Sequence, residues 1–232
     1  MKSSGVLERA DTFLHVGWHE SHTPWAPRAT RPFITISRQS GSGGTTLARM
    51  LARQLNKDAP RDVFWQIFEG NLTEMMLKAN HLPPRIGRFL PEGHISEVTA
   101  SVGELVGLHP SLWDLVQKTN ETIENLARAG NSILVGRGAN FATAAIPGGF
   151  HVRLVAPPLH RAHYIADLYG ISEKDALAFN AKRDSARRRY VKDTFSANVD
   201  DPSVYDLTIN TASLSFPDAA KLIADHLHSQ SP

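Results

Sequence analysis

The stretch Phe33-Ile-Thr-Ile-Ser-Arg-Gln-Ser-Gly-Ser-Gly-Gly-Thr-Thr46 decides the fold of this chain. Its first residues, 33 to 37, form the short apolar run that is typical of a buried strand. Glycines follow, and they let the backbone turn with positive φ and bring its amides close to a guest. The next apolar residues share one helical face: Leu47, Met50, Leu51 and Leu55. A strand, a turn and a helix N-terminus in this order favour a binding site for phosphate.

Length and composition bound the class of protein. The chain has 232 residues, of which 41% are hydrophobic and 21% charged, which predicts one globular domain with a sizeable core. The formal net charge is only +2, so no global field drives binding to nucleic acid. The chain contains no cysteine and no apolar run of about 20 residues, the length that a membrane span requires. We expect a cytoplasmic protein that does not enter a membrane.

Strand and helix patterns alternate along the remaining sequence. Apolar runs at 132–135, 150–156 and 204–209 predict strands, and a strand within 63–77 is one interpretation of that mixed region. Helix starts are indicated after Ser111, at the prolines 157 and 158, and at Ser172 and Ser215, where Ser-x-x-Asp resembles a capping box. This alternation predicts an α/β fold with a mostly parallel sheet that is covered on both faces.

The first 31 residues differ from the rest because they show no sustained periodicity. We interpret residues 1–31 as an extension that packs on the domain or stays mobile, and residues 32–232 as the domain itself. His15, His19 and His22 have a spacing that can bind metal in a helix, but Pro24 makes a polar extension the favoured interpretation. Residues 80–110 are rich in Pro and Gly and predict an irregular insert or short helices.

The glycine-rich turn departs from the usual phosphate-loop pattern, G-x-x-x-x-G-K-[ST]. Gly43 and Thr45 match it, but Arg38 stands at the first glycine position and Gly44 at the lysine position. The lysine that normally bridges phosphates is therefore missing. The hydroxyl of Thr45 or Thr46 is a candidate ligand for a magnesium ion bound to the phosphates.

Several stretches together resemble a known family. The run 34–44 is similar to the start of the cytidylate kinase-like family, a branch of the nucleoside monophosphate kinases whose loop also tends to lack the lysine. The stretches 133–141, 183–190 and 201–210 support the match in the family's order, over most of residues 33–228. The resemblance implies a P-loop NTPase-type three-layer α/β/α fold with a five-stranded sheet and a helical lid. It also implies ATP as phosphoryl donor, Mg²⁺ as cofactor and a nucleoside monophosphate of the CMP type as acceptor.

The resemblance also assigns roles to individual residues. Arg137 matches the arginine that holds the acceptor phosphate, and Asp184 and Arg187, with Arg183 beside them, match the D-x-x-R lid over the transferred group. Such roles suit arginine, because phosphoryl transfer depends on positioning and on cations around the phosphate oxygens. Thr45 would also hold the metal. The residues expected around the donor phosphates are Arg38, Gly41, Ser42, Gly43, Gly44, Thr45 and Thr46.

Two departures from true cytidylate kinases leave alternatives open. Gly44 replaces the lysine and Gly138 replaces the aspartate after the motif arginine, so an arginine at 38, 137, 183 or 187 must supply the missing charge. One alternative is a regulatory module that binds nucleotide without efficient transfer. Another is phosphorylation of a non-nucleotide metabolite on the same fold. The end of the second strand shows no expected Asp, and Gln66 and Glu69 are the nearest polar candidates.

The basic run on the lid favours a phosphate lid or a solvated helix face over nucleic-acid binding, because no nucleic-acid motif accompanies it. This run comprises Lys182, Arg183, Arg187, Arg188, Arg189 and Lys192. Tyr190, Phe195 and Tyr205 either stack on a base or pack against the domain. Assembly into a homo-oligomer is left open by the sequence.

Overall fold

A computed structural model describes residues 31–57, 59–60, 63–69 and 112–230. The predicted extension before residue 31, with its histidines, and the insert predicted at 80–110 lie outside these residues, so both stay predictions. The elements in chain order are β1 (Phe33–Arg38), α2 (Gly44–Leu55), β2 (Gln66–Phe68), α5 (Leu112–Ala129), β3 (Ser132–Val135), α6 (Ala139–Ala142), β4 (Gly149–Val155), α7 (Pro158–Tyr169), α8 (Glu173–Phe195), the 3-10 turn η4 (Pro202–Val204), β5 (Leu207–Asn210) and α9 (Phe216–Gln230).

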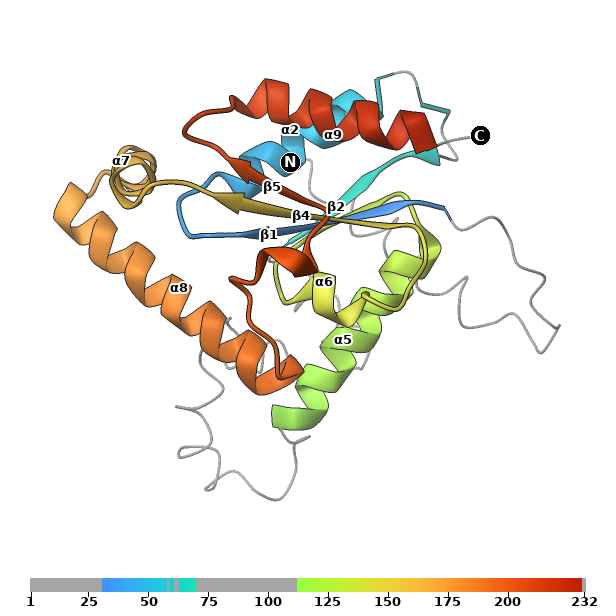
Figure 1. Ribbon diagram of the computed structural model, residues 1–232, viewed down its shortest axis with the longest axis horizontal. Coiled ribbons are helices and arrows are strands. Elements are labelled where there is room, and N and C mark those ends of the chain that lie inside the picture. Colours follow the sequence, from blue (N-terminus) through green and yellow to red (C-terminus); the bar gives the residue numbers. More distant parts are fainter. Residues whose placement is uncertain (1–30, 58, 61–62, 70–111, 231–232) are drawn as a thin grey trace, which may run out of the picture.

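The strands form one five-stranded sheet in the order β2-β3-β1-β4-β5. Every neighbouring pair is parallel, so the sheet is wholly parallel where a mostly parallel one was expected. Helices α2 and α9 cover one face and α5 and α6 the other, which confirms the three-layer α/β/α fold (Figure 1). Helices α7 and α8 lie beyond the carboxyl ends of the strands. Ligands of such sheets bind at these ends.

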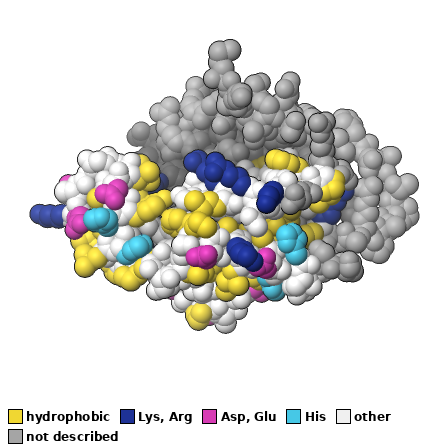
Figure 2. All heavy atoms as spheres, turned by 90° about the horizontal axis from the view of Figure 1, so that it is seen from above, with side chains coloured by type: hydrophobic (Ala, Val, Ile, Leu, Met, Phe, Trp, Pro, Cys, Tyr) yellow, Lys and Arg dark blue, Asp and Glu magenta, His cyan; other side chains and the backbone are white. Residues whose placement is uncertain are grey.

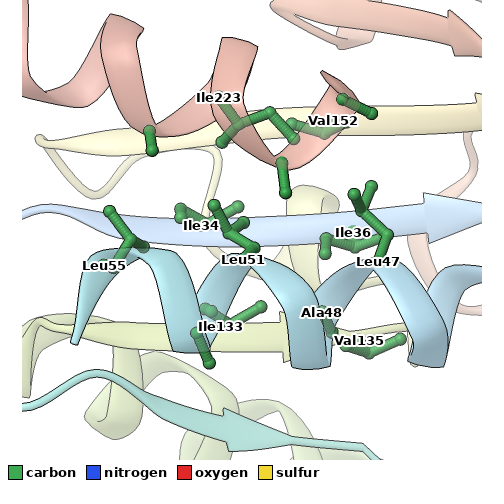
Figure 3. Close-up of a cluster of buried hydrophobic side chains, with 14 of the residues drawn as sticks. Ile34, Ile36, Leu47, Ala48, Leu51, Leu55, Ile133, Val135, Val152 and Ile223 are labelled. Atoms are coloured by element: carbon green, nitrogen blue, oxygen red, sulfur yellow. The ribbon is translucent and has the colours of Figure 1, made fainter. Parts of the chain in front are cut away.

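The larger core lies between the sheet and the helices α2 and α9. Leu47, Leu51 and Leu55 project from α2 onto the sheet, as their spacing predicted (Figure 3). They pack on Ile34 and Ile36 of β1 and on further residues of β3, β4 and α9: Ile133, Val135, Val152 and Ile223. This contact fixes the helix that follows the glycine-rich turn firmly to the strand that precedes it.

Local sequence explains where most of the helices begin. The Ser172 hydroxyl accepts a hydrogen bond from Asp175 N at 3.1 Å and the Ser215 hydroxyl one from Asp218 N at 3.3 Å, so both predicted caps are present. Pro158 opens α7, and Gly170 ends it with a positive φ of 65°. The last strand begins later than expected, at Leu207 instead of 204. The reason is a turn that Pro202 starts, with the Asp201 carboxylate accepting from Ser203 N at 2.9 Å.

Helix α8 packs along α7 with an inner face that is largely polar. Its buried residues are Ala176, Asn180, Asp184, Arg187, Tyr190 and Val191. The face of the molecule that carries α9 shows acidic, basic and apolar side chains interspersed rather than one basic stripe (Figure 2). Among the described helices, none combines the length and apolar character that crossing a bilayer demands.

Candidate active site

The glycine-rich turn links β1 to α2 and presents the start of the helix. Gly41 has a φ of 80° and Gly43 a φ of 79°, so both use the backbone region that favours glycine. Gly43 is the N-cap residue of α2, and as a glycine it offers no side chain to cap the first amides of the helix. The first amides of a helix have no acceptor within it, so those of residues 44–46 are oriented to bind an anion.

Gly43 is also restricted by a neighbour from α9. A Cβ atom at this position would lie 2.1 Å from Cζ of Phe216, whereas one at Gly170, where φ is 65°, would meet nothing within 4 Å. We therefore expect Gly43→Ala to lower the free energy of unfolding by about 3 kcal/mol, from backbone strain plus overpacking. Gly170→Ala is the matched control. It should lower the free energy of unfolding only by the backbone strain, about 1 kcal/mol. Urea denaturation measures both, and equal losses would exclude the contact with Phe216.

Glu69 lies beside the turn, directly after β2. Its Oε2 accepts a hydrogen bond from Oγ1 of Thr45 at 2.7 Å, at an exposed position. Arg49 is 3.8 Å from the other carboxylate oxygen. Of the two polar candidates near the end of the second strand, the structure therefore brings Glu69 to the glycine-rich turn. Thr46 is bonded elsewhere, since its Oγ1 lies 2.7 Å from the Tyr164 hydroxyl of α7.

Asp184 anchors α8 to the glycine-rich turn. Its Oδ1 accepts from Ser40 N at 2.7 Å and from Arg187 at 2.8 Å, and its Oδ2 accepts from Arg161 of α7 at 2.7 Å. Arg161 also donates to the Ser40 carbonyl at 2.8 Å. Asp184, Arg161 and Arg187 are all buried. We call this cluster the Asp184 clamp. It fixes the backbone of the turn at Ser40, because the amide and the carbonyl of Ser40 both bond to it.

A hollow opens next to the turn, between the carboxyl ends of β1 and β3 and the side of α8. It is an open hollow of about 250 Å³, a volume that includes the solvent at its mouth. Arg38, Arg137 and Arg187 all line it. So does Asn140, which is 4% exposed and whose Nδ2 has no hydrogen-bond partner among the described residues. Cations together with a buried donor that lacks a partner favour an anion as the occupant of this hollow.

The match to known proteins covers the same elements. A model of the cytidylate kinase-like family matches residues 33–213, from β1 to the end of the sheet. The chain belongs to the cytidylate kinase-like family. It is 30% identical to the cytidylate kinase of Thermococcus kodakarensis over 198 residues, which cover 84% of this chain and 88% of that protein. It is 28% identical to the cytidylate kinase of Pyrobaculum aerophilum over 196 residues, covering 83% and 91%.

A solved structure of an uncharacterized protein from Eubacterium ventriosum has the same fold. The TM-score is 0.64 at 19% sequence identity, and the match covers 86% of this chain and 99% of that one. Membership of the family together with the parallel sheet and the glycine-rich turn establishes the P-loop kinase-type fold.

One departure from true cytidylate kinases, Gly138, has a structural explanation. Its φ is 66°, and a Cβ atom there would lie 2.3 Å from Cε2 of Phe195. Phe195 also stacks on Phe141, with ring centroids 5.6 Å apart. Tyr190 packs edge-on against Phe195 at 6.2 Å. Phe195 and Tyr190 therefore pack against the domain, and Phe195 occupies the space that a side chain at 138 would need.

The basic run of α8 is divided among different partners. Arg187 joins the Asp184 clamp, and Arg188 lies 3.5 Å from Asp200. Arg183, which the family resemblance placed over the transferred group, is exposed and lies 5.0 Å from the centre of the Phe179 ring. Arg187 lines the hollow, whereas Arg183, one helical turn earlier, is exposed and is not among the residues that line it.

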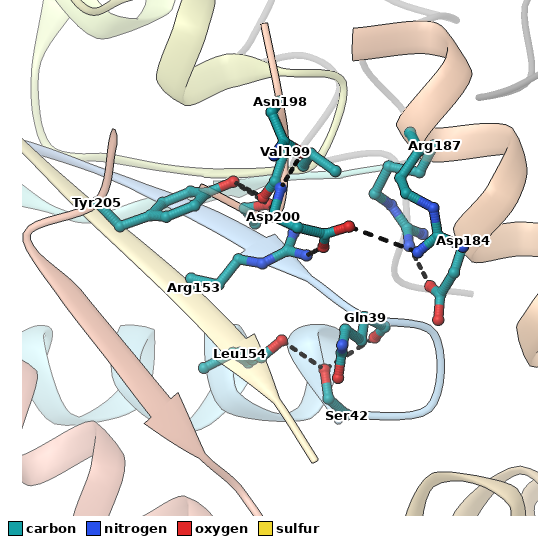
Figure 4. A network of polar contacts seen from close by, with 12 residues as sticks. Gln39, Ser42, Arg153, Leu154, Asp184, Arg187, Asn198, Val199, Asp200 and Tyr205 are labelled. Atoms are coloured by element: carbon teal, nitrogen blue, oxygen red, sulfur yellow. Dashed lines mark hydrogen bonds and ion pairs between the residues drawn. The ribbon is translucent and has the colours of Figure 1, made fainter. Parts of the chain in front are cut away.

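Sequence reasoning missed a buried arginine on β4. Arg153 donates to Oγ of Ser37 at 2.9 Å. It also donates to Oδ1 of Asp200 at 2.5 Å (Figure 4). Tyr205 donates to the Val199 carbonyl at 2.8 Å, and burial raises its pKa, so its phenol stays protonated as a donor. These bonds hold the segment after α8, whose Val199 lines the hollow, against the sheet. An arginine within the apolar run 150–156 was the available signal, because such a charge must be paired.

Proposed function

We propose that this protein transfers the γ-phosphoryl group of ATP to a nucleoside monophosphate of the CMP type. One observation supports this most: the glycine-rich turn and the arginine-lined hollow adjoin at the end of β1, where Arg38 belongs to both. Donor and acceptor phosphates bound there would be neighbours, and such positioning accounts for much of phosphoryl-transfer catalysis. The cytidylate kinases among the relatives favour CMP as the acceptor.

On the donor side, the turn would bind the triphosphate. The amides of Gly44, Thr45 and Thr46 at the start of α2 would face the phosphates, and the positive end of the α2 dipole would add to their attraction. Thr45 and Glu69 offer a hydroxyl and a carboxylate, hard oxygen ligands of the kind that Mg²⁺ takes together with phosphates and water. When bound, Mg²⁺ would neutralise charge that develops on the phosphate oxygens.

On the acceptor side, the hollow would bind the monophosphate group. The guanidinium groups of Arg137 and Arg187 and Nδ2 of Asn140 would each donate to its oxygens. An acceptor phosphate oxygen then attacks the γ-phosphorus, a new P–O bond forms, and the bond to the β,γ-bridging oxygen breaks. ADP leaves and the acceptor becomes a diphosphate. We assign Asp184 a positioning role in this step, because its oxygens are bonded to Ser40 and to arginines.

The metal assignment predicts a change in magnesium dependence. Thr45→Val keeps the shape of the side chain but removes the hydroxyl, and Glu69→Gln removes the charge. We expect each substitution to raise the Mg²⁺ concentration for half-maximal activity by about tenfold or more, as for other losses around metal sites. Titration of activity with MgCl₂ at saturating ATP measures this. Unchanged half-saturation in both variants would place the metal elsewhere.

The acceptor is tested by measuring ADP formation with a panel of acceptors. We expect ATP consumption to depend on a nucleoside monophosphate, and we expect CMP or another pyrimidine monophosphate to be the best acceptor. Shikimate and gluconate serve as non-nucleotide acceptors for comparison. ATP binding by calorimetry without ADP formation from any acceptor would contradict the transferase proposal. It would support the regulatory module instead.

A further inference from the structure

The glycine at position 44 is explained by a neighbouring side chain and not by its backbone. Gly44 begins α2 without the positive φ that makes glycine necessary. A Cβ atom at this position would lie 3.1 Å from Cγ, 3.3 Å from Cδ and 3.5 Å from Cβ of Arg38. These are its nearest neighbours, so the stem of Arg38 runs directly over Gly44. Any side chain at 44 would compete with Arg38 for that space.

Arg38 is held in this place by the sheet. It is the last residue of β1, and its Cα pairs with Leu154 of β4 in the ladder. The backbone of Arg38 therefore has a fixed register, and its side chain is directed toward the glycine-rich turn. Arg38 also lines the hollow beside Arg137 and Arg187. Its side chain thus joins the two halves of the candidate site.

We infer that Arg38 replaces the missing phosphate-loop lysine, and that residue 44 is glycine because the arginine needs its space. A lysine at 44 would start at the Cβ position that the Arg38 stem already contacts. Both cations would then approach the β- and γ-phosphates along the same path. A guanidinium is permanently charged and presents its N–H donors in a planar fork. It can therefore bridge oxygens of two phosphates, as the ammonium group of the phosphate-loop lysine does. This inference rests on the proposed function, because it assigns a further catalytic residue to that site.

The inference reverses the simplest expectation for restoring lysine. If the loop merely lacks a charge, Gly44→Lys adds one and should raise turnover. If Arg38 already fills this place, Gly44→Lys crowds the arginine and gives no gain, whereas the double variant Arg38→Ala, Gly44→Lys regains what Arg38→Ala alone loses. The two positions therefore form a double-mutant cycle with strong coupling.

Nucleotide binding measured by calorimetry tests the inference independently of turnover. The titrants are ATP and AMP, each with magnesium and without acceptor, on the full-length protein. Arg38→Met, which keeps most of the stem, should weaken ATP binding by roughly 10- to 100-fold, the effect of losing charge-assisted hydrogen bonds. AMP lacks the β- and γ-phosphates, so its binding should change by less than about twofold. Arg53→Met, on the exposed face of the same helix, is the matched control and should bind both nucleotides as wild type does.

Each outcome has a definite meaning. Equal losses for ATP and AMP, or no loss for either in a variant that stays folded by circular dichroism, would overturn the inference. Higher turnover or tighter ATP binding in Gly44→Lys alone would also overturn it. If wild type binds ATP but transfers nothing, the proposed function fails, while the ratio of ATP to AMP losses still decides the role of Arg38.

Discussion

Replacing Asp184 by alanine should destabilise the protein by about 3–5 kcal/mol, the cost of removing one partner from a buried ion pair. The residue is 7% exposed, and its carboxylate accepts from Arg161, Arg187 and the Ser40 amide. Alanine would leave both guanidinium groups buried without their carboxylate and the amide without its acceptor. Chemical denaturation monitored by circular dichroism measures the loss.

The same substitution should also weaken ATP binding, because the Asp184 clamp fixes the backbone of the glycine-rich turn at Ser40. Asp193→Ala is the control, since Asp193 is exposed on the same helix and its loss should change stability by no more than about 0.5 kcal/mol. Asp184→Asn keeps the shape of the side chain, and its loss of stability should lie between those of Asp184→Ala and Asp193→Ala. If Asp184→Ala unfolded with the same free energy as wild type, the clamp would have no structural role.

Substitution of Arg137 should have the largest effect on catalysis. Arg137 follows β3 with a φ of 57°, an unusual conformation for a residue with a side chain, and it lines the hollow. Backbone strain of this kind is often retained at functional sites. We expect Arg137→Met to lower kcat/KM for the monophosphate acceptor by on the order of 10²–10³, the scale for losing one charge-stabilising donor.

The pattern of the defect matters as much as its size. Because Arg137 belongs to the acceptor side, ATP binding measured without acceptor should stay within about twofold of wild type in Arg137→Met. Arg128→Met, an exposed arginine of α5 that pairs with Glu124, should leave transfer unchanged within about twofold. Loss of ATP binding together with acceptor use would show that Arg137 supports the fold, and not the acceptor site alone.

Much of the architecture could be predicted because its signals are local. The apolar run of β1, the leucine spacing of α2 and the serine caps at 172 and 215 act within a few residues of themselves. The sequence motif also indicated the glycine-rich turn and Arg137. The order of the strands in the sheet could be learned only from the structure, because hydrophobic runs do not identify which strands become neighbours.

The placement of side chains on α8 could not be predicted in the same way. Its buried face is largely polar, with Asn180, Asp184 and Arg187 pointing inward, so hydrophobic periodicity does not distinguish the inner face from the outer one. The motif therefore named Arg183 and Arg187 alike, although only Arg187 faces the hollow. Arg161 and Arg153 were missed because their partners are distant in the sequence, and long-range ion pairs leave no local pattern.

The central claim is that the glycine-rich turn and the hollow hold donor and acceptor phosphates side by side for direct transfer. The most direct test is to follow a label on the γ-phosphoryl group of ATP in a single turnover with CMP and magnesium. We predict that the label appears in CDP, one CDP for each ADP formed, and that Arg137→Met slows this transfer by on the order of 10²–10³. Release of the label to water at the same rate with and without CMP, or its retention in ATP bound to the protein, would contradict the claim.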